Sequence, residues 1–400
     1  MTSRDFLFTS ESVSEGHPDL VADQIADAIK DEILRQDPTA RTGIEVFLPK
    51  GVVHVGGEVT TNAYVDIEKV VRETILDIGY DNPEYGLDGR SVGVINSIVE
   101  QSKEIAGGVF DSYEKRNGLA GDTIDEQGAG DQGMEFGSAQ GHNKLIFPAP
   151  FTLARMLTHR MATIRKNGVG KGILLPDAKS QVTIGFENNE PRWVDSVLIS
   201  TQHTREINLS ELTDFVRAEV IEPVIDEYNE TQSFRPLRDN GKYLINPAGE
   251  WNIGGPASDA GLTGRKLQVL IGNGAWTRHG GGNASGKDGT KTDASAAVFT
   301  RWVAKHFVAA GLANEIELQV AYAIGSARPL SILVDTKGEH VDEKVLSRAL
   351  SVFDFRPAAI FQQLELEKPV YREAAREGYL GREGFAWENL TKLDELLAII

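Results

Sequence analysis

The chain of 400 residues contains no cysteine, and this absence excludes several kinds of chemistry at once. Disulfide bonds, thiolate metal centres and cysteine nucleophiles are all ruled out. Cations are also scarce, since 41 Lys and Arg residues stand against 59 Asp and Glu residues and leave a formal charge of -18. A protein this acidic is not expected to bind nucleic acid. Any phosphate-binding site must therefore be a local concentration of cations.

Long apolar runs are missing as well. No stretch is long enough to span a bilayer, and the first twelve residues, MTSRDFLFTSES, contain no apolar core of a signal peptide. We therefore expect a soluble, cytoplasmic protein with no membrane partner. Apolar residues still make up 40% of the chain, which is enough to bury large cores, and the length favours two or three domains.

The order of the predicted elements favours an α+β fold. Strands come mostly in pairs with helices after them, without strict βαβ alternation, so helices should pack on one face of each sheet. Periodicity and capping signals predict helices at 18–33, 66–78, 148–167, 209–228, 294–310, 342–353 and 394–400. Strands are predicted at 42–48, 52–61, 91–99, 181–186, 194–201, 243–246, 267–271, 315–324 and 330–335.

The segment 264–293 has the composition of a polyphosphate site. It contains Arg265 and Lys266, three successive glycines at 280–282, and then Lys287 and Lys291 among aspartates. Glycine lets backbone N–H groups approach an anion, lysine neutralises it, and carboxylates fit a divalent metal among the same oxygens. The alternative is an ordinary solvated loop.

One detail argues against a P-loop in this segment. Residues 281–287 match most of the pattern G-x-x-x-x-G-K, but Asp288 stands where a Ser or Thr would ligate magnesium. A nucleotide hydrolase of the P-loop kind is therefore poorly supported.

The first predicted helix carries aspartates at a helical spacing. Asp19 follows Gly16-His17-Pro18 at the helix start, where a carboxylate is held rigidly beside a possible cleft. Asp23 and Asp27 continue the same face at i+4 and i+8. For Asp27 we expect a solvated acidic surface, while His17 is either a surface histidine or a functional one.

Two further stretches leave alternatives open. GAGDQG at 128–133 matches G-x-G-x-x-G, but no strand precedes it, so a dinucleotide site is weakly supported and Asp131 inside the turn is the residue of interest. Residues 101–127 show no periodicity, which is typical of a lid or a disordered linker. We favour a lid.

Taken together, these motifs resemble the S-adenosylmethionine synthetase (methionine adenosyltransferase) family over essentially the whole chain. The matching stretches are FTSESVSEGHPD at 8–19, GGE at 56–58, GAGDQG at 128–133, PDAKSQVT at 176–183, GLTGRK at 261–266, HGGG at 279–282 and SGKD at 285–288. Several long motifs in the family's order are a specific signal.

The resemblance implies a reaction and an architecture. Methionine sulfur would attack C5′ of ATP and expel triphosphate, which is then hydrolysed to pyrophosphate and phosphate. The fold would be three similar α+β domains with pseudo-threefold symmetry, which we place at 1–113, with an active-site loop near 101–125, then 114–244 and 245–400. The family's active sites lie between two subunits, so a homodimer or homotetramer is implied.

The resemblance also assigns roles to individual residues. The catalytic set would be His17, Lys179, Arg265 and Lys287. ATP binding would add Asp177, Glu250, Trp251, Asp259, Lys266 and Asn283. Methionine would be bound by Glu58, Gln101, Asp131, Asp259 and Lys291. Two Mg²⁺ per site would be held by Asp19 and Asp293, and K⁺ by Glu45.

Some residues depart from the family pattern, notably Leu20, Glu250, Asn283, Ala284 and Ala294. Residues expected to touch phosphate or metal are retained. The departures leave two alternatives to an ordinary synthetase: an adenosyltransferase with altered nucleotide or amino-acid selectivity, and a diverged nucleotide-binding relative with a regulatory or structural role.

Overall fold

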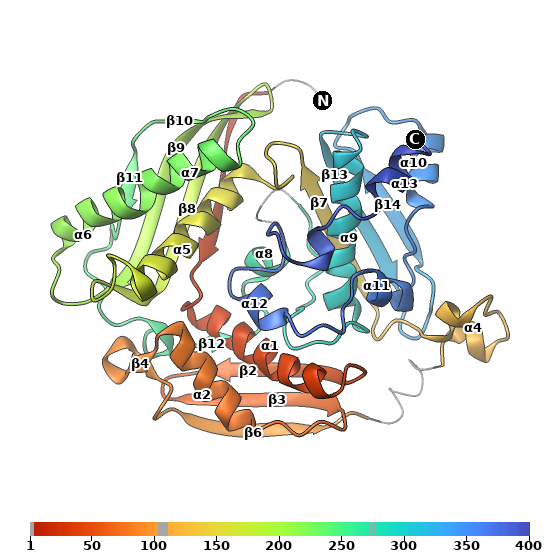
Figure 1. Cartoon of the computed structure of the whole chain (residues 1–400), viewed down its shortest axis with the longest axis horizontal. Helices are drawn as coiled ribbons and strands as arrows, with labels where there is room; N and C mark the ends of the chain where they lie inside the picture. The colour runs from red at the N-terminus through yellow and green to blue at the C-terminus, as the bar shows by residue number, and fades with distance from the viewer. Residues whose placement is uncertain (1–3, 103–110, 273, 275–276) are drawn as a thin grey trace.

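The computed structural model describes residues 4–102, 111–272, 274 and 277–400, and these form three α+β units around a common centre (Figure 1). The first unit contains α1 (Pro18–Gln36), β2 (Arg41–Leu48), β3 (Val52–Thr60), α2 (Ile67–Ile78) and β6 (Gly93–Glu100). The second contains α5 (Ala149–Asn167), β8 (Leu174–Glu187), β9 (Glu190–His203), α6 (Leu209–Val216), α7 (Glu222–Thr231) and β11 (Tyr243–Ile245). The third contains α9 (Thr292–Ala309), β13 (Glu315–Tyr322), β14 (Ser331–Asp335) and α10 (Glu343–Leu350).

Smaller elements complete the chain. They are β4 (Asp81–Asn82), β5 (Leu87–Asp88), α4 (Tyr113–Arg116), β10 (Arg238–Asp239), α8 (Leu267–Leu270), α11 (Pro357–Gln363), α12 (Tyr371–Ala375) and α13 (Leu393–Leu397). No helix within the described ranges has the length and apolar character that a membrane span requires.

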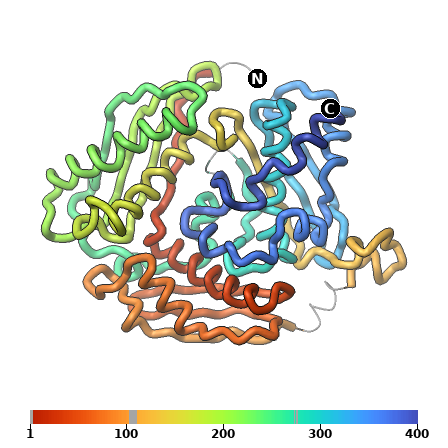
Figure 2. The backbone as a smooth tube through the Cα atoms, in the orientation of Figure 1, coloured from red at the N-terminus to blue at the C-terminus, as the bar shows by residue number. Residues whose placement is uncertain are grey.

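In each unit, the strand that precedes the long helix pairs with the sheet of a different unit. The strands that precede the three long helices are β1 (Phe6–Val13), β7 (Gly133–Gln140) and β12 (Gly261–Leu262). They pair antiparallel with β8, β13 and β2, the first hairpin strands of the second, third and first units. Figure 2 shows the first exchange as a red tube running from the lower unit along the second unit. The exchange is cyclic, which gives the molecule its pseudo-threefold symmetry.

Three separate hydrophobic cores lie between the sheets and their long helices. Alternate residues of the first hairpin, such as Ile44, Val46 and Val55, point toward apolar residues of α1. The second core joins α5 and α7 to β8 and β9, and the third surrounds Trp302 of α9. The strand exchange ties these cores together, because one strand of each of the three larger sheets comes from another unit.

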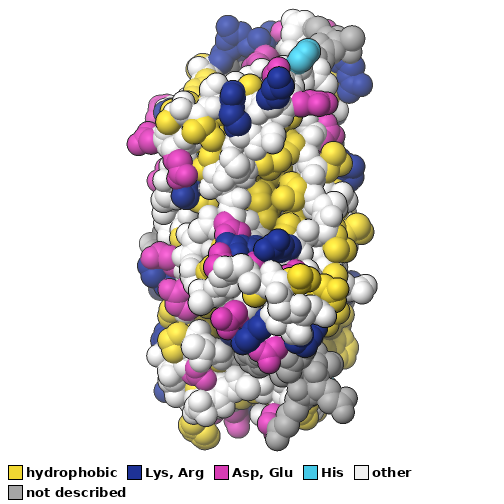
Figure 3. Space-filling model, turned by 90° about the vertical axis from the view of Figure 1, so that its right-hand side faces the viewer, with side chains coloured by type: hydrophobic (Ala, Val, Ile, Leu, Met, Phe, Trp, Pro, Cys, Tyr) yellow, Lys and Arg dark blue, Asp and Glu magenta, His cyan; other side chains and the backbone are white. Residues whose placement is uncertain are grey.

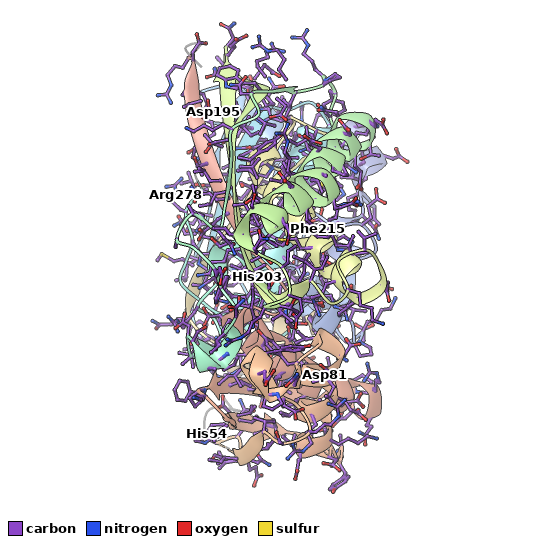
Figure 4. All side chains as sticks on the ribbon, turned by 90° about the vertical axis from the view of Figure 1, so that its left-hand side faces the viewer. His54, Asp81, Asp195, His203, Phe215 and Arg278 are labelled. Atoms are coloured by element: carbon purple, nitrogen blue, oxygen red, sulfur yellow. The ribbon has the colours of Figure 1, made fainter. Side chains whose placement is uncertain are left out.

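Among the described residues, the sheets leave one broad side without long helices (Figure 4). Figure 4 labels three residues along that side: His54 on a strand of the first sheet, Asp195 on a strand of the second, and Arg278, which bonds Glu317 of the third. Phe215 of α6 lies on the opposite side. Several strands present exposed apolar side chains, namely Leu7, Phe47, Ile95, Val99, Met134 and Leu333. Figure 3 also shows hydrophobic side chains gathered in a hollow at the middle of its view.

Most predicted elements are confirmed, with shifts of a few residues at their ends. The prediction of a strand at 267–271 is wrong, because these residues form the single helical turn α8. Ile271 N donates a hydrogen bond to Leu267 O at 3.0 Å, which closes the turn. Five apolar-rich residues fit a buried helical turn as well as a strand, and Val269 and Leu270 are buried here.

The segment predicted as a lid is divided by the structure. Residues 103–110 lie outside the described residues. Residues after 111 contain α4 and a 3₁₀ turn at Thr123–Glu126, and they are tied to the third unit by Tyr113 N donating to Gly325 O at 2.7 Å and by Arg328 bonding Asp125 at 2.8 Å. The domain limits 1–113, 114–244 and 245–400 stay a prediction.

Candidate active site

The first group of charged side chains gathers where β1 runs into α1. His17 caps α1 and Pro18 occupies its first turn, so Asp19 begins the helix in a fixed position. Lys179 stands opposite Val13 in the β1–β8 pairing, and Arg265 and Lys266 follow β12. We call His17, Asp19, Lys179, Arg265 and Lys266 the histidine cluster. It draws on strands and loops from all three predicted domains.

Asp19 is the centre of the histidine cluster. It is buried, and its Oδ2 lies 2.7 Å from Lys266 Nζ while Oδ1 accepts a hydrogen bond from Leu262 N at 3.0 Å and lies 3.6 Å from Arg265 Nη1. The approach of β12 to the start of α1 requires glycine at 261, because a Cβ there would come within 2.1 Å of the Pro18 carbonyl oxygen. The local backbone therefore brings two cations onto one buried carboxylate.

His17 is a neutral imidazole in this setting. Burial, together with the nearby Lys266, Lys179 and Arg265, lowers its pKa to about 3 against the opposing effect of Asp19. Its Nδ1 accepts a hydrogen bond from Asp19 N at 3.2 Å, so the proton of the neutral ring resides on Nε2. His17 can therefore donate one hydrogen bond from Nε2 to an anionic oxygen.

Asp177 and its neighbours border the histidine cluster. Asp177 is buried, accepts a hydrogen bond from Gly255 N at 2.9 Å, and has a pKa raised to about 7 by burial, with Lys179 acting against the rise. Asp259 is exposed but close enough to act electrostatically on Asp177. Trp251 precedes Gly255 by four residues, and its ring N–H donates to Ile253 O at 2.8 Å. Glu250 beside it is exposed.

A second group of charged side chains lies at the start of α9. Lys287 forms a short ion pair with Asp293, and Glu135 of β7 hydrogen-bonds the same Asp293. We call Glu135, Lys287 and Asp293 the lysine cluster. Burial and the adjacent Asp293 raise the pKa of Glu135 to about 9, while Lys287 opposes the rise. Glu135 was not among the residues that the sequence suggested.

The glycine-rich loop covers the lysine cluster closely. A Cβ on Gly282 would come within 2.4 Å of the Asp293 carboxyl carbon, so only glycine lets the loop pass there. At the start of the loop, His279 Nδ1 accepts a hydrogen bond from Gly281 N at 2.8 Å. Burial lowers the pKa of this histidine. Asn283 bonds the backbone of Ser285 rather than pointing outward.

The structure gives Asp288 a structural role that a P-loop does not have. Its carboxylate accepts hydrogen bonds from Thr42 N at 2.8 Å and from Thr290 N at 2.9 Å, and the backbone of Lys287 bridges to Gly43 of β2. The loop is thus fastened to a sheet edge instead of linking a strand directly to a helix. The partial P-loop match is fortuitous.

The acidic face of α1 is buried, and the expectation of a solvated Asp27 is wrong. The aspartates at 19, 23, 27 and 31 accept backbone N–H groups from Leu262, Gly264, Gly286 and the pair Tyr371 and Arg372, at 2.9–3.1 Å. One face of α1 therefore holds both phosphate-site candidates, the 262–266 segment and the 284–290 loop. Spacing predicted that these carboxylates share a face, but not that other backbone segments would cover them.

Asp27 is paired with an equally buried cation. Lys30 Nζ lies 2.7 Å from Asp27 Oδ1, donates to the Lys287 carbonyl oxygen at 3.2 Å, and lies 3.5 Å from the Tyr371 ring centre. Tyr379 donates a short hydrogen bond to Asp27. This buried pair sets the backbone position of Lys287.

The residues expected to bind methionine or potassium lie on or next to the first sheet and the GAGDQG turn. Glu58 reaches Gly43, which bridges to Lys287, and Gln101 accepts from Thr60 at 3.2 Å. Glu45 is exposed and accepts a short hydrogen bond from Thr263. Asp131 is exposed in its glycine turn, where Gly130 N donates to Thr290 O at 3.0 Å, and Lys291 caps α9 nearby.

The two clusters do not merge within one chain. Among the described residues, no hydrogen bond or ion pair joins a side chain of the histidine cluster to one of the lysine cluster.

Three of the departures from the family pattern are in the core, since Leu20, Ala284 and Ala294 are all buried.

The donor set suits a divalent ion that also binds phosphate. Within the described ranges, no three His, Asp or Glu side chains form a group of candidate metal ligands. Asp19 and Asp293 each offer carboxylate oxygens beside cations, and Mg²⁺ in nucleotide sites is commonly held by one or two carboxylates plus substrate phosphates. Carboxylates flanked by lysine and arginine side chains fit that arrangement.

The chain is similar to known proteins along its whole length. Residues 5–103, 126–251 and 253–389 match the models of the N-terminal, central and C-terminal domains of S-adenosylmethionine synthetase. An S-adenosylmethionine synthase of Leifsonia xyli subsp. xyli is 49% identical over 395 residues, covering 98% of this chain and 97% of the relative. Synthases of Salinispora tropica and Salinispora arenicola are each 47% identical over 404 residues, covering 100% of this chain and 99% of those proteins.

Proposed function

The chain belongs to the S-adenosylmethionine synthetase family and makes S-adenosylmethionine from ATP and L-methionine, and we propose that the histidine and lysine clusters together carry out this reaction. A thioether sulfur is a neutral nucleophile with no proton to lose. Catalysis must therefore align sulfur with C5′ and stabilise the anionic triphosphate that leaves. A set of cations around a neutral histidine is suited to that task.

In this proposal the histidine cluster handles the leaving group. Lys179, Arg265 and Lys266 neutralise the phosphates, and His17 donates its Nε2–H to the oxygen that leaves C5′. The supporting observation is the protonation state: Nδ1 is occupied by a backbone N–H, and burial among cations keeps the ring neutral. A neutral donor needs no proton exchange during each turnover. Asp177, Asp259 and Trp251 border the place where the nucleoside would lie, with Glu250 and Asn283 at its edge.

The family depends on divalent metal ions, and the finer assignment is ours. We assign one Mg²⁺ to Asp19 and a second to Asp293, and K⁺ to Glu45. When bound, such ions neutralise phosphate oxygens and help to orient the chain of phosphates. Lys266 and Lys287, which contact these carboxylates here, would then turn to the phosphates.

The amino-acid substrate is assigned to the surroundings of the lysine cluster. Lys291 and Glu58 carry the charges that complement the carboxylate and ammonium of methionine, and Gln101 lies at the end of β6 beside Glu58's strand. Asp131 and Asp259 would lie near the sulfonium that forms, where a carboxylate favours a cation.

The separation of the two clusters supports an active site shared between two subunits, in a homodimer or homotetramer. The side of the sheets without long helices exposes apolar side chains that a second copy would cover. The altered-selectivity alternative, which Glu250 and Asn283 motivated, is not favoured, because S-adenosylmethionine synthases 47–49% identical to this chain match over nearly its whole length. The non-catalytic alternative is not favoured, since both clusters are complete.

A subunit-mixing experiment tests the shared site. His17→Ala and Lys287→Ala should each form no product with ATP, methionine, Mg²⁺ and K⁺. Co-expressed with different tags, they should regain about a quarter of wild-type activity, because half of the dimers are mixed and each has one intact site of two. His17→Ala with Lys266→Ala is the matched control and should regain none. Equal recovery in both mixtures, or none in either, refutes the assignment, whereas an inactive wild type refutes the function.

A further inference from the structure

Glu135 is a buried carboxyl group of the lysine cluster, and the proposed reaction gives it no role of its own. It lies on β7 opposite Val320 of β13 and is 2% exposed. The strand alternates, so Met134 is exposed on the open face while Glu135 faces α9. Gly137, two residues on, confirms this direction, because a Cβ there would meet the α9 backbone at Arg301 N within 2.1 Å. A charged group on an inward position of this strand calls for a reason.

The Glu135 carboxyl group has two other side-chain oxygen atoms near it, and the three surround one small space. That space is left open by the missing side chain of Gly133. From the position that a Cβ would take there, Thr292 Oγ1 lies at 3.0 Å, and Asp293 Oδ1 and Glu135 Oε1 each lie at 3.6 Å. Glu135 also hydrogen-bonds Asp293 directly. Two carboxyl groups and a hydroxyl therefore converge beside Lys287.

Thr292 supplies an independent sign that something binds in this space. Its side chain is buried, with 1% exposure, and within the described part of the chain its Oγ1 makes no hydrogen bond. Buried hydroxyl groups without a partner are rare in folded proteins and point to a water or an ion. An ion is favoured by the two adjacent carboxyl groups, because a divalent cation that displaces the proton between them is attracted to both carboxylates.

We propose that Glu135 is an additional carboxylate ligand of the divalent ion assigned to Asp293, with the Thr292 hydroxyl as a neutral oxygen ligand. This inference rests on the proposed metal role of Asp293. Hard divalent cations prefer oxygen ligands of this kind. A second carboxylate makes the protein itself a better ligand, so the lysine cluster should bind a divalent ion before ATP arrives, without help from phosphate oxygens.

Manganese binding to the nucleotide-free full-length protein tests the inference. Free Mn²⁺ is followed by its electron paramagnetic resonance signal during titration, in an Asp19→Asn background so that the other assigned metal site does not contribute. Glu135→Gln should weaken Mn²⁺ binding by about 10- to 100-fold. Glu315→Gln is the matched control, since Glu315 is a buried carboxylate of the neighbouring strand β13 paired with Gln140, and it should bind Mn²⁺ as the parent does.

Glutamine separates the two roles that Glu135 could have. Its amide donates a hydrogen bond to Asp293 much as an uncharged carboxylic acid would, but it offers no negative charge. Unchanged Mn²⁺ affinity in Glu135→Gln therefore overturns the ligand role and leaves Glu135 a neutral support. Asp293→Asn distinguishes the premise: if it also binds Mn²⁺ unchanged, the metal role of Asp293 fails instead. Glu135→Met, which suits an apolar strand, gives the same comparison if the glutamine variant does not fold, and it should also lose affinity.

Discussion

The buried pair Asp27–Lys30 allows a quantitative prediction about how the 284–290 loop is held. Both side chains are fully buried, and Asp27 also accepts Gly286 N at 2.9 Å, directly before Lys287. Asp27→Asn keeps the shape of the side chain but leaves Lys30 as an unpaired buried ammonium. Removing one partner of a buried pair costs about 3–5 kcal/mol. Against a typical total stability of about 5–15 kcal/mol, this is a large loss.

The double variant separates charge from shape. Lys30→Met alone leaves the Asp27 carboxylate unpaired and should cost a similar amount. Asp27→Asn with Lys30→Met removes both charges of this pair, so the loss should fall to about 1–3 kcal/mol, the scale of the hydrogen bonds removed. The two single losses therefore sum to far more than the double, and the coupling energy should exceed about 2 kcal/mol.

Urea unfolding of the four proteins at one protein concentration, followed by circular dichroism, measures this cycle. Tyr379→Phe is the control, because it removes one hydrogen bond to Asp27 and should cost only about 1 kcal/mol. Losses for the two single variants that add up in the double to within about 0.5 kcal/mol would refute the reasoning. In that case the pair would not act as one unit beneath the loop.

Two more predictions follow from the same loop and helix. Gly282→Ala should displace the Asp293 carboxylate, which a Cβ would approach to 2.4 Å, and should therefore weaken the affinity for Mn²⁺. Gly56→Ala is the control, because nothing lies within 4 Å of a Cβ there, and it should leave the affinity unchanged. Equal effects of the two substitutions would show that the close contact between Gly282 and Asp293 does not matter for metal binding. Burial raises the pKa of Asp31 to about 6, so the folded protein holds this proton more tightly than the unfolded chain, and the resulting stabilisation is present below about pH 4 and is lost as the pH rises through 6. The difference of about 2 pH units between the folded and unfolded pKa corresponds to about 3 kcal/mol of unfolding free energy. The unfolding free energy of Asp31→Asn, measured between pH 4 and 7, should therefore fall less with rising pH than that of the parent. An equal fall in both proteins would show that other groups cause it.

Local patterns in the sequence were sufficient for much of the fold. The long helices α1, α5 and α9 and the paired strands after them follow from periodicity, because a long amphipathic segment has few alternatives. The five residues at 267–271 were mistaken for a strand because so short a run carries no decisive period. Nothing in the sequence pattern indicated that β1, β7 and β12 pair outside their own units, since strand partners are chosen by packing rather than by local propensity.

By itself, the sequence determined the chemistry: an acidic chain without cysteine, a histidine close to an aspartate at the start of a helix, and lysines among glycines, in motifs specific enough to identify the family. Only the tertiary structure decided how these charges are used. It placed the neutral His17 against Lys266, buried the acidic face of α1 beneath two backbone segments, and set Glu135 against Asp293. The physical reason is that burial and neighbouring charges fix protonation and pairing, and both depend on contacts between residues hundreds of positions apart.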